Sequence, residues 1–305
     1  DLGGCFGPTC KVIGGYDFVN NDNDPKDDHG HGTHVAATAA GKGLLLGVAP
    51  DAKILAYKVL NSAGAGSFSA IVAAIQRATD PNNDGSSADH ADVISMSLGA
   101  TCGSYSTSCG PDDSVSLAVD QATANGVVSA IAAGNSGSGP STVGTPGVAR
   151  TAVTVAATCA PHADLAANYC SQPIASFSSR GPVIWNGIDL KKPDIAAPGV
   201  MICAARYGSA FSTAPTCFDS QHIRISGTSM ATPHIAGVLA LVRQTFPNYT
   251  PDQIKNLIKS STNSLGMTYN DQGAGEIDLS KVPFGTVSSL SFSPSAFWTV
   301  TTNPT

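Results

Sequence analysis

The sequence contains few charged residues and no cluster of positive charge. Only 12% of its 305 residues are charged, with a formal net charge of −6, so it lacks the basic surface that nucleic acids and anionic membranes attract. No apolar run is long enough to span a membrane, and the first residues lack the charged and apolar regions of a secretory signal. We therefore expect no nucleic-acid partner and no membrane association, and a secreted form would already be processed.

The eight cysteines include no C-x-x-C motif, which argues against a metal site of that type. They fall into close pairs instead, although sequence alone leaves many connectivities open. Pairing between neighbours would close short loops rich in Gly, Ser, Pro and Ala. Four such disulfides would indicate an oxidising, extracellular compartment and would brace surface loops. The expected pairs are Cys5–Cys10, Cys102–Cys109, Cys159–Cys170 and Cys203–Cys217.

Apolar, β-rich runs alternate with helical patterns along most of the chain. Strands are expected at residues 11–18, 53–60, 93–98, 127–133 and 152–157, with further regular structure at 174–179 and 194–205. Helices are expected at 33–40, 68–78, 114–124, 229–246 and 251–260, the last capped by Thr250. Repeated strand–helix units predict an α/β fold whose mostly parallel sheet is covered on both faces.

Ser229 stands at the junction between a predicted strand and the helix 229–246. It belongs to the run Ser226-Gly227-Thr228-Ser229-Met230-Ala231-Thr232-Pro233. Ser229 would lie at the positive end of the helix dipole, and the main-chain N–H of Ser229 would be free to donate to a developing oxyanion. Pro233 lies near the helix start, where a missing N–H is tolerated. Position alone favours a simple helix cap, because serine is a common cap.

Histidines gather at the start of the helix predicted at 33–40. They belong to the run His29-Gly30-His31-Gly32-Thr33-His34-Val35-Ala36. Histidine suits a general base because its ordinary pKa lies near neutrality. A metal site is the alternative, but zinc peptidases place two histidines four residues apart around a glutamate. His31 and His34 are three residues apart with no glutamate between them, which favours the general base.

Asn135 follows the strand predicted at 127–133. It belongs to the run Ala132-Ala133-Gly134-Asn135-Ser136-Gly137. A side-chain amide at the end of a strand can donate a hydrogen bond to an oxyanion. An asparagine in an ordinary turn is the alternative, and this motif taken alone favours the turn.

These three motifs, in the order histidine, asparagine and serine, resemble those of the subtilisin family of serine peptidases. The resemblance extends over about residues 1–281 and implies a three-layer α/β fold. It also implies that Ser229 is the nucleophile, His31 the general base and Asn135 the oxyanion donor. His34 would then be a structural residue beneath the site, and His29 a solvated loop residue.

Two further segments resemble the substrate cleft of that family. One side would be formed by the strand that includes Ser97, Leu98 and Gly99, together with Ala133 and Gly134. The opposite edge would be formed by the segment that contains Gly64 and Gly66. An extended peptide would bind between them by strand addition, through main-chain contacts. The small residues imply an open cleft with broad specificity.

The sequence lacks the Asp-Ser/Thr-Gly motif in which this family carries the aspartate that orients the catalytic histidine. Asp1-Leu2 resembles the end of a turn that follows the motif, so the aspartate would lie upstream of Asp1. Asp17 and Asp22 stand outside such a motif and receive no catalytic role. The chain is then either a peptidase shortened at its N-terminus or a pseudo-enzyme. The otherwise intact site favours the first alternative.

Two loops rich in oxygen-bearing side chains are candidate calcium sites. The first resembles a calcium loop of the thermitase branch of the family, with Asp17, Asp22 and Asp24 as ligands, but Asn20 stands where that branch has an acid. The second begins like an EF-hand but has Ala91 in place of the closing glutamate. Its candidate ligands are Asp80, Asn82, Asp84 and Asp89. In both loops an ordinary turn is the alternative.

The motifs together predict a secreted serine endopeptidase that acts on proteins or peptides as a monomer, with structural Ca²⁺. The alternative is a catalytically inactive binding or scaffold protein of the same fold. A lipase or esterase is rejected, because those enzymes carry serine in G-x-S-x-G with a later histidine. Residues 1–281 are expected to form the peptidase domain, and 282–305 a β-rich tail or the start of a further module.

Overall fold

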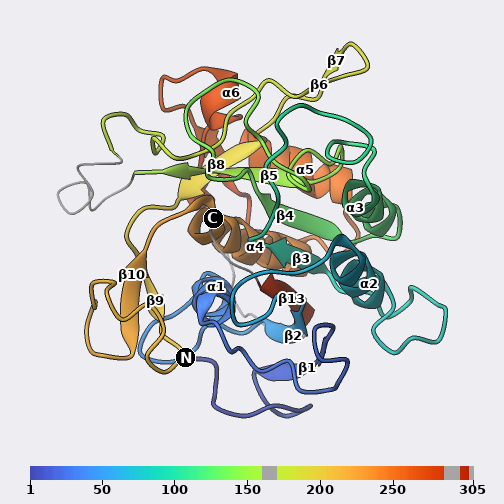
Figure 1. Ribbon diagram of the computed structural model, residues 1–305, viewed down its shortest axis with the longest axis vertical. Coiled ribbons are helices and arrows are strands. Elements are labelled where there is room, and N and C mark those ends of the chain that lie inside the picture. Colours follow the sequence, from blue (N-terminus) through green and yellow to red (C-terminus); the bar gives the residue numbers. More distant parts are fainter. Residues whose placement is uncertain (160–169, 285–295, 302–305) are drawn as a thin grey trace.

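The chain folds around one central sheet with helices packed on both faces (Figure 1), so the predicted three-layer α/β fold is confirmed. This computed structural model describes residues 1–159 and 170–284, and the backbone of residues 296–301. Within these ranges, none of the helices combines the length and apolarity needed to cross a bilayer. The cysteines pair as predicted, in the disulfides Cys5–Cys10, Cys102–Cys109, Cys159–Cys170 and Cys203–Cys217.

The sheet contains nine described strands in the order β1-β2-β13-β3-β4-β5-β8-β12-β11. Neighbouring strands run parallel, except that β11 and β12 are antiparallel. Parallel strands end at the same edge, so the segments that follow β2, β3 and β4 meet at the carboxyl edge of the sheet. The strands are β1 Val12–Asp17, β2 Lys53–Lys58, β3 Val93–Met96, β4 Val128–Ala132, β5 Val153–Thr158, β8 Ile195–Pro198, β11 Thr262–Asn263, β12 Glu276–Ile277 and β13 Ala296–Thr301.

Two apolar cores separate the helices into layers. Residues of α1, α4 and α5 pack with one face of the sheet, and residues of α2 and α3 pack with the other. Successive side chains of a strand point into opposite cores, as those of Val93 and Ile94 do, because side chains alternate along a strand. The helices are α1 His31–Ala40, α2 Phe68–Thr79, α3 Ser114–Ala124, α4 Thr228–Thr245, α5 Pro251–Ser260 and α6 Tyr269–Gln272, followed by a 3₁₀ turn at Leu279–Lys281.

A glycine allows α1 and α4 to pack closely. A Cβ on Gly237 would lie 2.5 Å from the Cβ of Val48 and 3.0 Å from the main-chain oxygen of Ala39. No side chain would fit without displacing this backbone. The sequence therefore fixes the approach of the two helices that carry the histidine and serine motifs.

The structure departs from the predicted elements in several places. Residues 174–179 form no strand beyond a single bridge from Ile174 to Thr158. The region 194–205 divides around Gly199 into β8 and β9 (Ile202–Ala205), and Gly199 packs so closely that a Cβ there would lie 2.5 Å from the Cβ of Ala157. Two hairpins were not predicted: β9 with β10 (His222–Ile225), and β6 (Ile184–Trp185) with β7 (Ile188–Asp189).

The C-terminal segment contributes a strand to the middle of the sheet. The backbone of β13 pairs in parallel with β2 on one side and with β3 on the other. Figure 1 shows this strand between them. The other residues of the predicted tail from 285 onward lie outside the described residues.

Candidate active site

The N-termini of α1 and α4 both lie at the carboxyl edge of the sheet. The chain passes from the end of α1 to the start of β2, so α1 runs against the strand direction. The last turn of α4 lies at the opposite edge, since Arg243 Nη2 donates 2.6 Å to the main-chain oxygen of Gly126, just before β4. The two helices pack against each other. His31, the first residue of α1, and Ser229, the second of α4, therefore lie at the same edge.

Asp27 positions the start of α1. Its carboxylate accepts hydrogen bonds from the main-chain N–H groups of His29, Gly30 and Thr33 at 2.8–2.9 Å, and from the Thr33 hydroxyl at 2.7 Å. Burial alone would raise the pKa of Asp27, but these hydrogen bonds hold it below its ordinary value. Because both carboxylate oxygens serve the helix, Asp27 does not orient His31. Sequence reasoning missed this residue, although an acid just before a helix is a capping signal.

The His31 imidazole is buried and has no hydrogen-bond partner in the described part of the chain. The residue is only 1% exposed, and neither ring nitrogen is paired within the described residues. Burial, with smaller contributions from nearby His34 and His29, lowers the pKa of His31 to about 3. The ring is therefore neutral at physiological pH, as a general base must be. Among the described residues, no carboxylate is hydrogen-bonded to this ring as the acid of a catalytic triad would be.

Ser229 is held at its main-chain oxygen by a neighbouring strand. Ser97, which follows β3, donates its hydroxyl to the Ser229 oxygen at 2.7 Å, while the Ser229 hydroxyl donates to the main-chain oxygen of Ser97 at 3.4 Å. Helix α4 begins at Thr228, so Pro233 lies beyond the first turn and deprives the Ser229 oxygen of its helical donor. Ser97 supplies the missing hydrogen bond. The Ser229 hydroxyl is not hydrogen-bonded to His31 in this state.

The amide of Asn135 is oriented by Thr228. Its Oδ1 accepts hydrogen bonds from the main-chain N–H and the hydroxyl of Thr228, both at 2.9 Å. A Cβ built on Gly227 would lie 3.6 Å from Asn135 Nδ2 and 3.6 Å from the main-chain nitrogen of Ser229. The two nitrogens therefore lie close to the same point, as a pair of donors to one oxyanion must. Sequence reasoning missed the role of Thr228, although it lies inside the serine motif.

A pocket beside Ser229 brings together most of the residues predicted to bind substrate. Leu98 and Gly99 line one wall, and Ala133, Gly134 and Asn135 line the other. The two walls follow β3 and β4, whose carboxyl ends lie side by side.

Three other residues predicted in the cleft lie outside the lining of this pocket. Ser97 is fully buried, and its hydroxyl is bound to Ser229. Gly64 and Gly66 lie in the turn after β2, where Gly66 bridges to Leu60.

The two remaining histidines of the motif differ in their surroundings. His34 is fully buried, and its Nε2 lies 3.0 Å from the main-chain oxygen of Ile202 and 3.3 Å from that of Ile223. It ties α1 to β9 and β10, in keeping with the structural role expected of it. The solvated position expected for His29 is wrong, because its ring is half-buried and lies 5.5 Å from the ring of Phe211.

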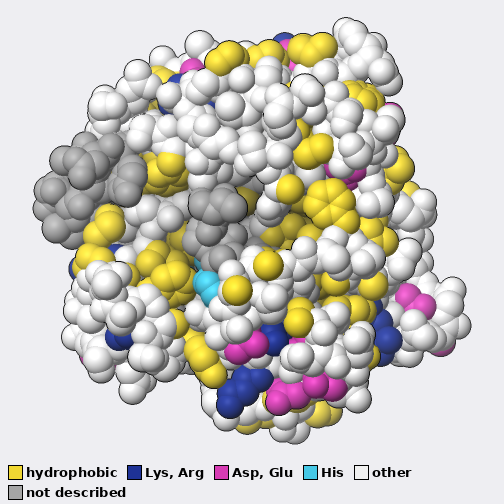
Figure 2. Space-filling view, viewed as in Figure 1, with side chains coloured by type: hydrophobic (Ala, Val, Ile, Leu, Met, Phe, Trp, Pro, Cys, Tyr) yellow, Lys and Arg dark blue, Asp and Glu magenta, His cyan; other side chains and the backbone are white. Residues whose placement is uncertain are grey.

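The first candidate calcium loop already contains a protein cation. Lys58 Nζ lies 3.0 Å from Asp17 and 2.8 Å from Asp28. Burial alone would raise the pKa of Asp17, but hydrogen bonds from Asn20 and Lys58 hold it below its ordinary value. Asp22 and Asp24 are exposed at the surface. Figure 2 shows acidic and basic side chains together on the side where Figure 1 places β1. As arranged, Asp17 does not fit a calcium ion, because Lys58 balances its charge.

The second candidate loop gathers its acidic residues through hydrogen bonds. Asp80 accepts from the main-chain N–H groups of Asp84 and Gly85 at 3.1 and 2.8 Å. Asn82 donates from Nδ2 to Asp84 at 3.0 Å, and from its main-chain nitrogen to Asp89 at 3.2 Å. In the described residues no group of three or more His, Cys, Asp or Glu is arranged as a finished metal site. The side chains are nevertheless of the type that calcium prefers.

The sequence and the fold match known peptidases. The profile of the Subtilase family (peptidase S8) matches residues 9–276. Serine protease AprX of Bacillus subtilis (strain 168) is 37% identical over 88% of this chain and 61% of its own length, so the chain spans less than two thirds of that relative. Subtilisin DY of Bacillus licheniformis is 37% identical over 85% of this chain and 80% of its own length.

Solved structures give the same result. Sphericase superposes with a TM-score of 0.66 and 31% identity, over 86% of this chain and 83% of its own. A cold-adapted subtilisin-like serine proteinase superposes with a TM-score of 0.64 and 32% identity, over 88% and 80%. The match to the family profile covers most of the chain and includes the His31, Asn135 and Ser229 motifs. This chain belongs to the Subtilase family.

Proposed function

We propose that the chain is a serine endopeptidase that hydrolyses peptide bonds through an acyl-enzyme. The observation that carries this proposal is the pair of nitrogens, Asn135 Nδ2 and the Ser229 main-chain nitrogen, that lie close to one point beside the serine. A carbonyl oxygen placed there would gain negative charge between two fixed hydrogen-bond donors. Relatives named serine protease and subtilisin support the same reaction.

The reaction divides between Ser229 and His31. The Ser229 oxygen bonds to the carbonyl carbon while its proton passes to His31, and the carbonyl electron pair moves to the oxygen. When the C–O double bond re-forms, the C–N bond breaks, and His31 returns the proton to the departing amine. Water then attacks the acyl-enzyme in the same way, with His31 as the base. The carboxylic acid product leaves, and Ser229 regains its proton. For the first step, the Ser229 hydroxyl must turn away from Ser97 toward His31, and such contacts often form only with substrate bound.

The acid that orients His31 is proposed to lie outside the described residues. Support comes from the unpaired ring nitrogens of His31 and from Asp27, whose oxygens are used by α1. In subtilisin, loss of this acid lowers kcat by on the order of 10⁴-fold. A chain without this acid would therefore turn over slowly. The competing proposal is an inactive binding protein of the same fold.

An extracellular location and a structural calcium ion complete the proposal. Four disulfides are typical of proteins that fold in an oxidising compartment. For calcium we favour the second loop, where Asp80, Asn82, Asp84 and Asp89 would be ligands. The ion would balance the charges of the three aspartates in this loop and would stabilise the C-terminal end of α2.

Covalent labelling of the serine tests the endopeptidase proposal. A fluorophosphonate should label the folded chain once, at Ser229: the serine oxygen bonds to phosphorus, the P–F bond breaks and fluoride leaves, and the serine proton passes to His31, while the phosphonyl oxygen lies near Asn135 Nδ2 and the Ser229 nitrogen. Ser229→Ala should remove the label, whereas Ser226→Ala, three residues earlier, should retain it. Intact mass and peptide mapping would measure both. A folded chain that remains unlabelled after prolonged incubation, or that labels equally in Ser229→Ala, would instead support the binding protein.

A further inference from the structure

We infer that Thr101, Ser136 and the Cys102–Cys109 loop limit the pocket beside Ser229, so that the chain favours a small aliphatic side chain on the residue whose carbonyl is attacked. This inference rests on the proposed endopeptidase function. Ser229 and Asn135 both line the pocket. A carbonyl oxygen held between their donors therefore leaves the side chain of the same residue beside the pocket entrance.

The base of the pocket is closed by main-chain hydrogen bonds. Ala100 and Thr145 exchange N–H···O bonds at 2.8 and 3.0 Å, which joins one wall to the base. A Cβ on Gly144 would lie 2.5 Å from the main-chain oxygen of Ala100, so nothing larger than glycine fits. The Thr145 hydroxyl also lies 3.2 Å from that of Ser116 on α3. The base therefore cannot recede without breaking contacts to a helix.

A hydrogen bond joins the two walls. The hydroxyls of Thr101, on the wall after β3, and Ser136, on the wall after β4, lie 2.9 Å apart. The pocket has a cavity volume of about 40 Å³. An apolar cavity that accepts a benzene ring has a volume of roughly 150 Å³. The pocket therefore suits the side chain of alanine or valine and is too small for an aromatic ring.

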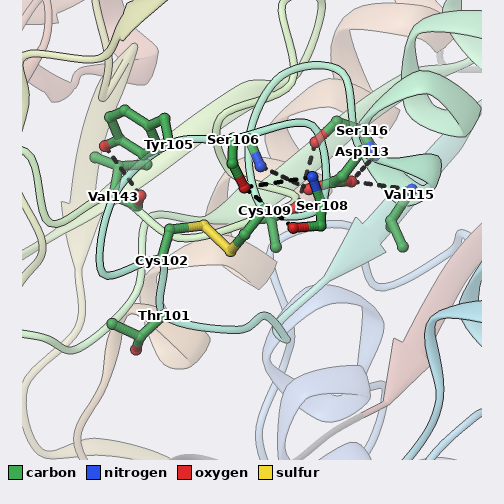
Figure 3. The surroundings of a disulfide bond; sticks show 12 residues. Thr101, Cys102, Tyr105, Ser106, Ser108, Cys109, Asp113, Val115, Ser116 and Val143 are labelled. Atoms are coloured by element: carbon green, nitrogen blue, oxygen red, sulfur yellow. Dashed lines mark hydrogen bonds between the residues drawn. A yellow bond between two sulfur atoms is a disulfide. The ribbon is translucent and has the colours of Figure 1, made fainter.

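The loop that carries Thr101 is braced at several points (Figure 3). Thr101 precedes Cys102, which is 7% exposed and disulfide-bonded to Cys109. Within the loop, the Tyr105 hydroxyl donates 3.1 Å to the main-chain oxygen of Val143. Because the loop is fixed to the body of the protein, Thr101 is held in place. Its contact with Ser136 therefore restrains the wall after β4.

The braced loop also connects to α3. Directly after Cys109, the Gly110 N–H donates 2.9 Å to Asp113. Asp113 in turn caps α3 by accepting from the main-chain N–H groups of Val115 and Ser116. Ser116 is the residue whose hydroxyl meets Thr145 at the base of the pocket. The disulfide loop and the base are thus held by the same helix.

Peptide boronic acids that differ only in the side chain next to boron test this inference. Boron accepts the Ser229 oxygen without a turnover, and the contribution of the acid that orients His31 cancels in the ratio between two boronates. Calorimetry should give tighter binding for alanine than for phenylalanine, by about tenfold or more. Thr101→Ala with Ser136→Ala should narrow that ratio by about tenfold, mainly through improved binding of phenylalanine. Cys102→Ser with Cys109→Ser should act in the same direction.

Matched controls separate this inference from the function it rests on. Ser106→Ala with Ser108→Ala removes a hydroxyl pair at 3.1 Å in the same loop, away from the pocket lining, and should leave the ratio unchanged. Thr101→Ser retains the hydroxyl and should keep the preference for alanine. Boronates that bind with an unchanged ratio in the Thr101/Ser136 variant would overturn the pocket inference alone. Boronates that fail to bind, or that bind Ser229→Ala equally, would overturn the endopeptidase function itself.

Discussion

The main-chain oxygen of Ser229 is held by a side chain and not by its own helix. Pro233 removes the donor that α4 would supply, and the Ser97 hydroxyl replaces it at 2.7 Å. Each motif could be located in the sequence, because small residues and a helix start are local features. The partnership between Ser97 and Ser229 could not, since it depends on β3 ending beside the N-terminus of α4. The contact between Thr228 and Asn135 could not be predicted either, since it depends on the segment after β4 lying beside the N-terminus of α4.

Burial makes His31 a base that stays neutral far into the acid range. Burial lowers the pKa of His31 to about 3, from an ordinary value of 6.5. Between pH 7.5 and 5.5, the rate of fluorophosphonate labelling at Ser229 should therefore fall less than about twofold. An imidazole of ordinary pKa would lose about tenfold over the same range. A limb near pH 6–7 would contradict a pKa near 3 for His31 and would mean that a carboxylate pairs with its ring.

Folding must be followed in the same experiment, because the two buried histidines also affect stability. The pKa of His34 is lowered to about 4 by burial, and both histidines have folded pKa values below the unfolded value of 6.5. The unfolded chain then binds protons first, so their contribution to stability is complete above pH 6.5 and declines toward pH 4 and 3. Circular dichroism should show a folded chain at pH 5.5.

At the scale of elements, prediction succeeded where apolar patterns were long. Helix α3 and α5 have the predicted bounds, and Thr250 caps α5 as expected, with a capping box to Gln253. The hairpins β6–β7 and β9–β10 were missed because their strands are only two and four residues long. The second hairpin is fixed by the Cys203–Cys217 disulfide and by His34, which are contacts between distant segments.

The loop after α2 should respond to calcium. In a hundredfold excess over its Kd, Ca²⁺ would add about 2.7 kcal/mol to the free energy of unfolding. At about 2–4 °C per kcal/mol, the melting midpoint in calcium should exceed that in chelator by about 5–10 °C. Asp84→Asn should remove most of this difference, because it takes one carboxylate from the proposed ligands. Asp22→Asn in the first loop should retain it. Equal midpoints in calcium and chelator would count against the site.

At the scale of the whole molecule, the sequence indicated a parallel sheet but not the order of its strands. The position between β2 and β3 is occupied by β13, although about two hundred residues separate β13 from β3 in the chain. Strand order depends on how crossover connections pack, which local patterns do not encode. This position matters for the site, because β13 runs parallel to β3 and its carboxyl end lies at the edge where His31 and Ser229 meet.

Removal of β13 should destabilise the centre of the sheet. A chain that ends at Phe284 would lose the ladders to both β2 and β3, which contain several hydrogen bonds at about 1 kcal/mol each. The total is on the order of 5 kcal/mol, which corresponds to about 10 °C or more in the melting midpoint. A chain that ends at Thr301 keeps β13 and should melt like the full chain. Amide exchange should also accelerate in β2 and β3 before it does in β5. Equal midpoints and unchanged exchange in the two truncated chains would show that another arrangement fills the centre of the sheet in solution.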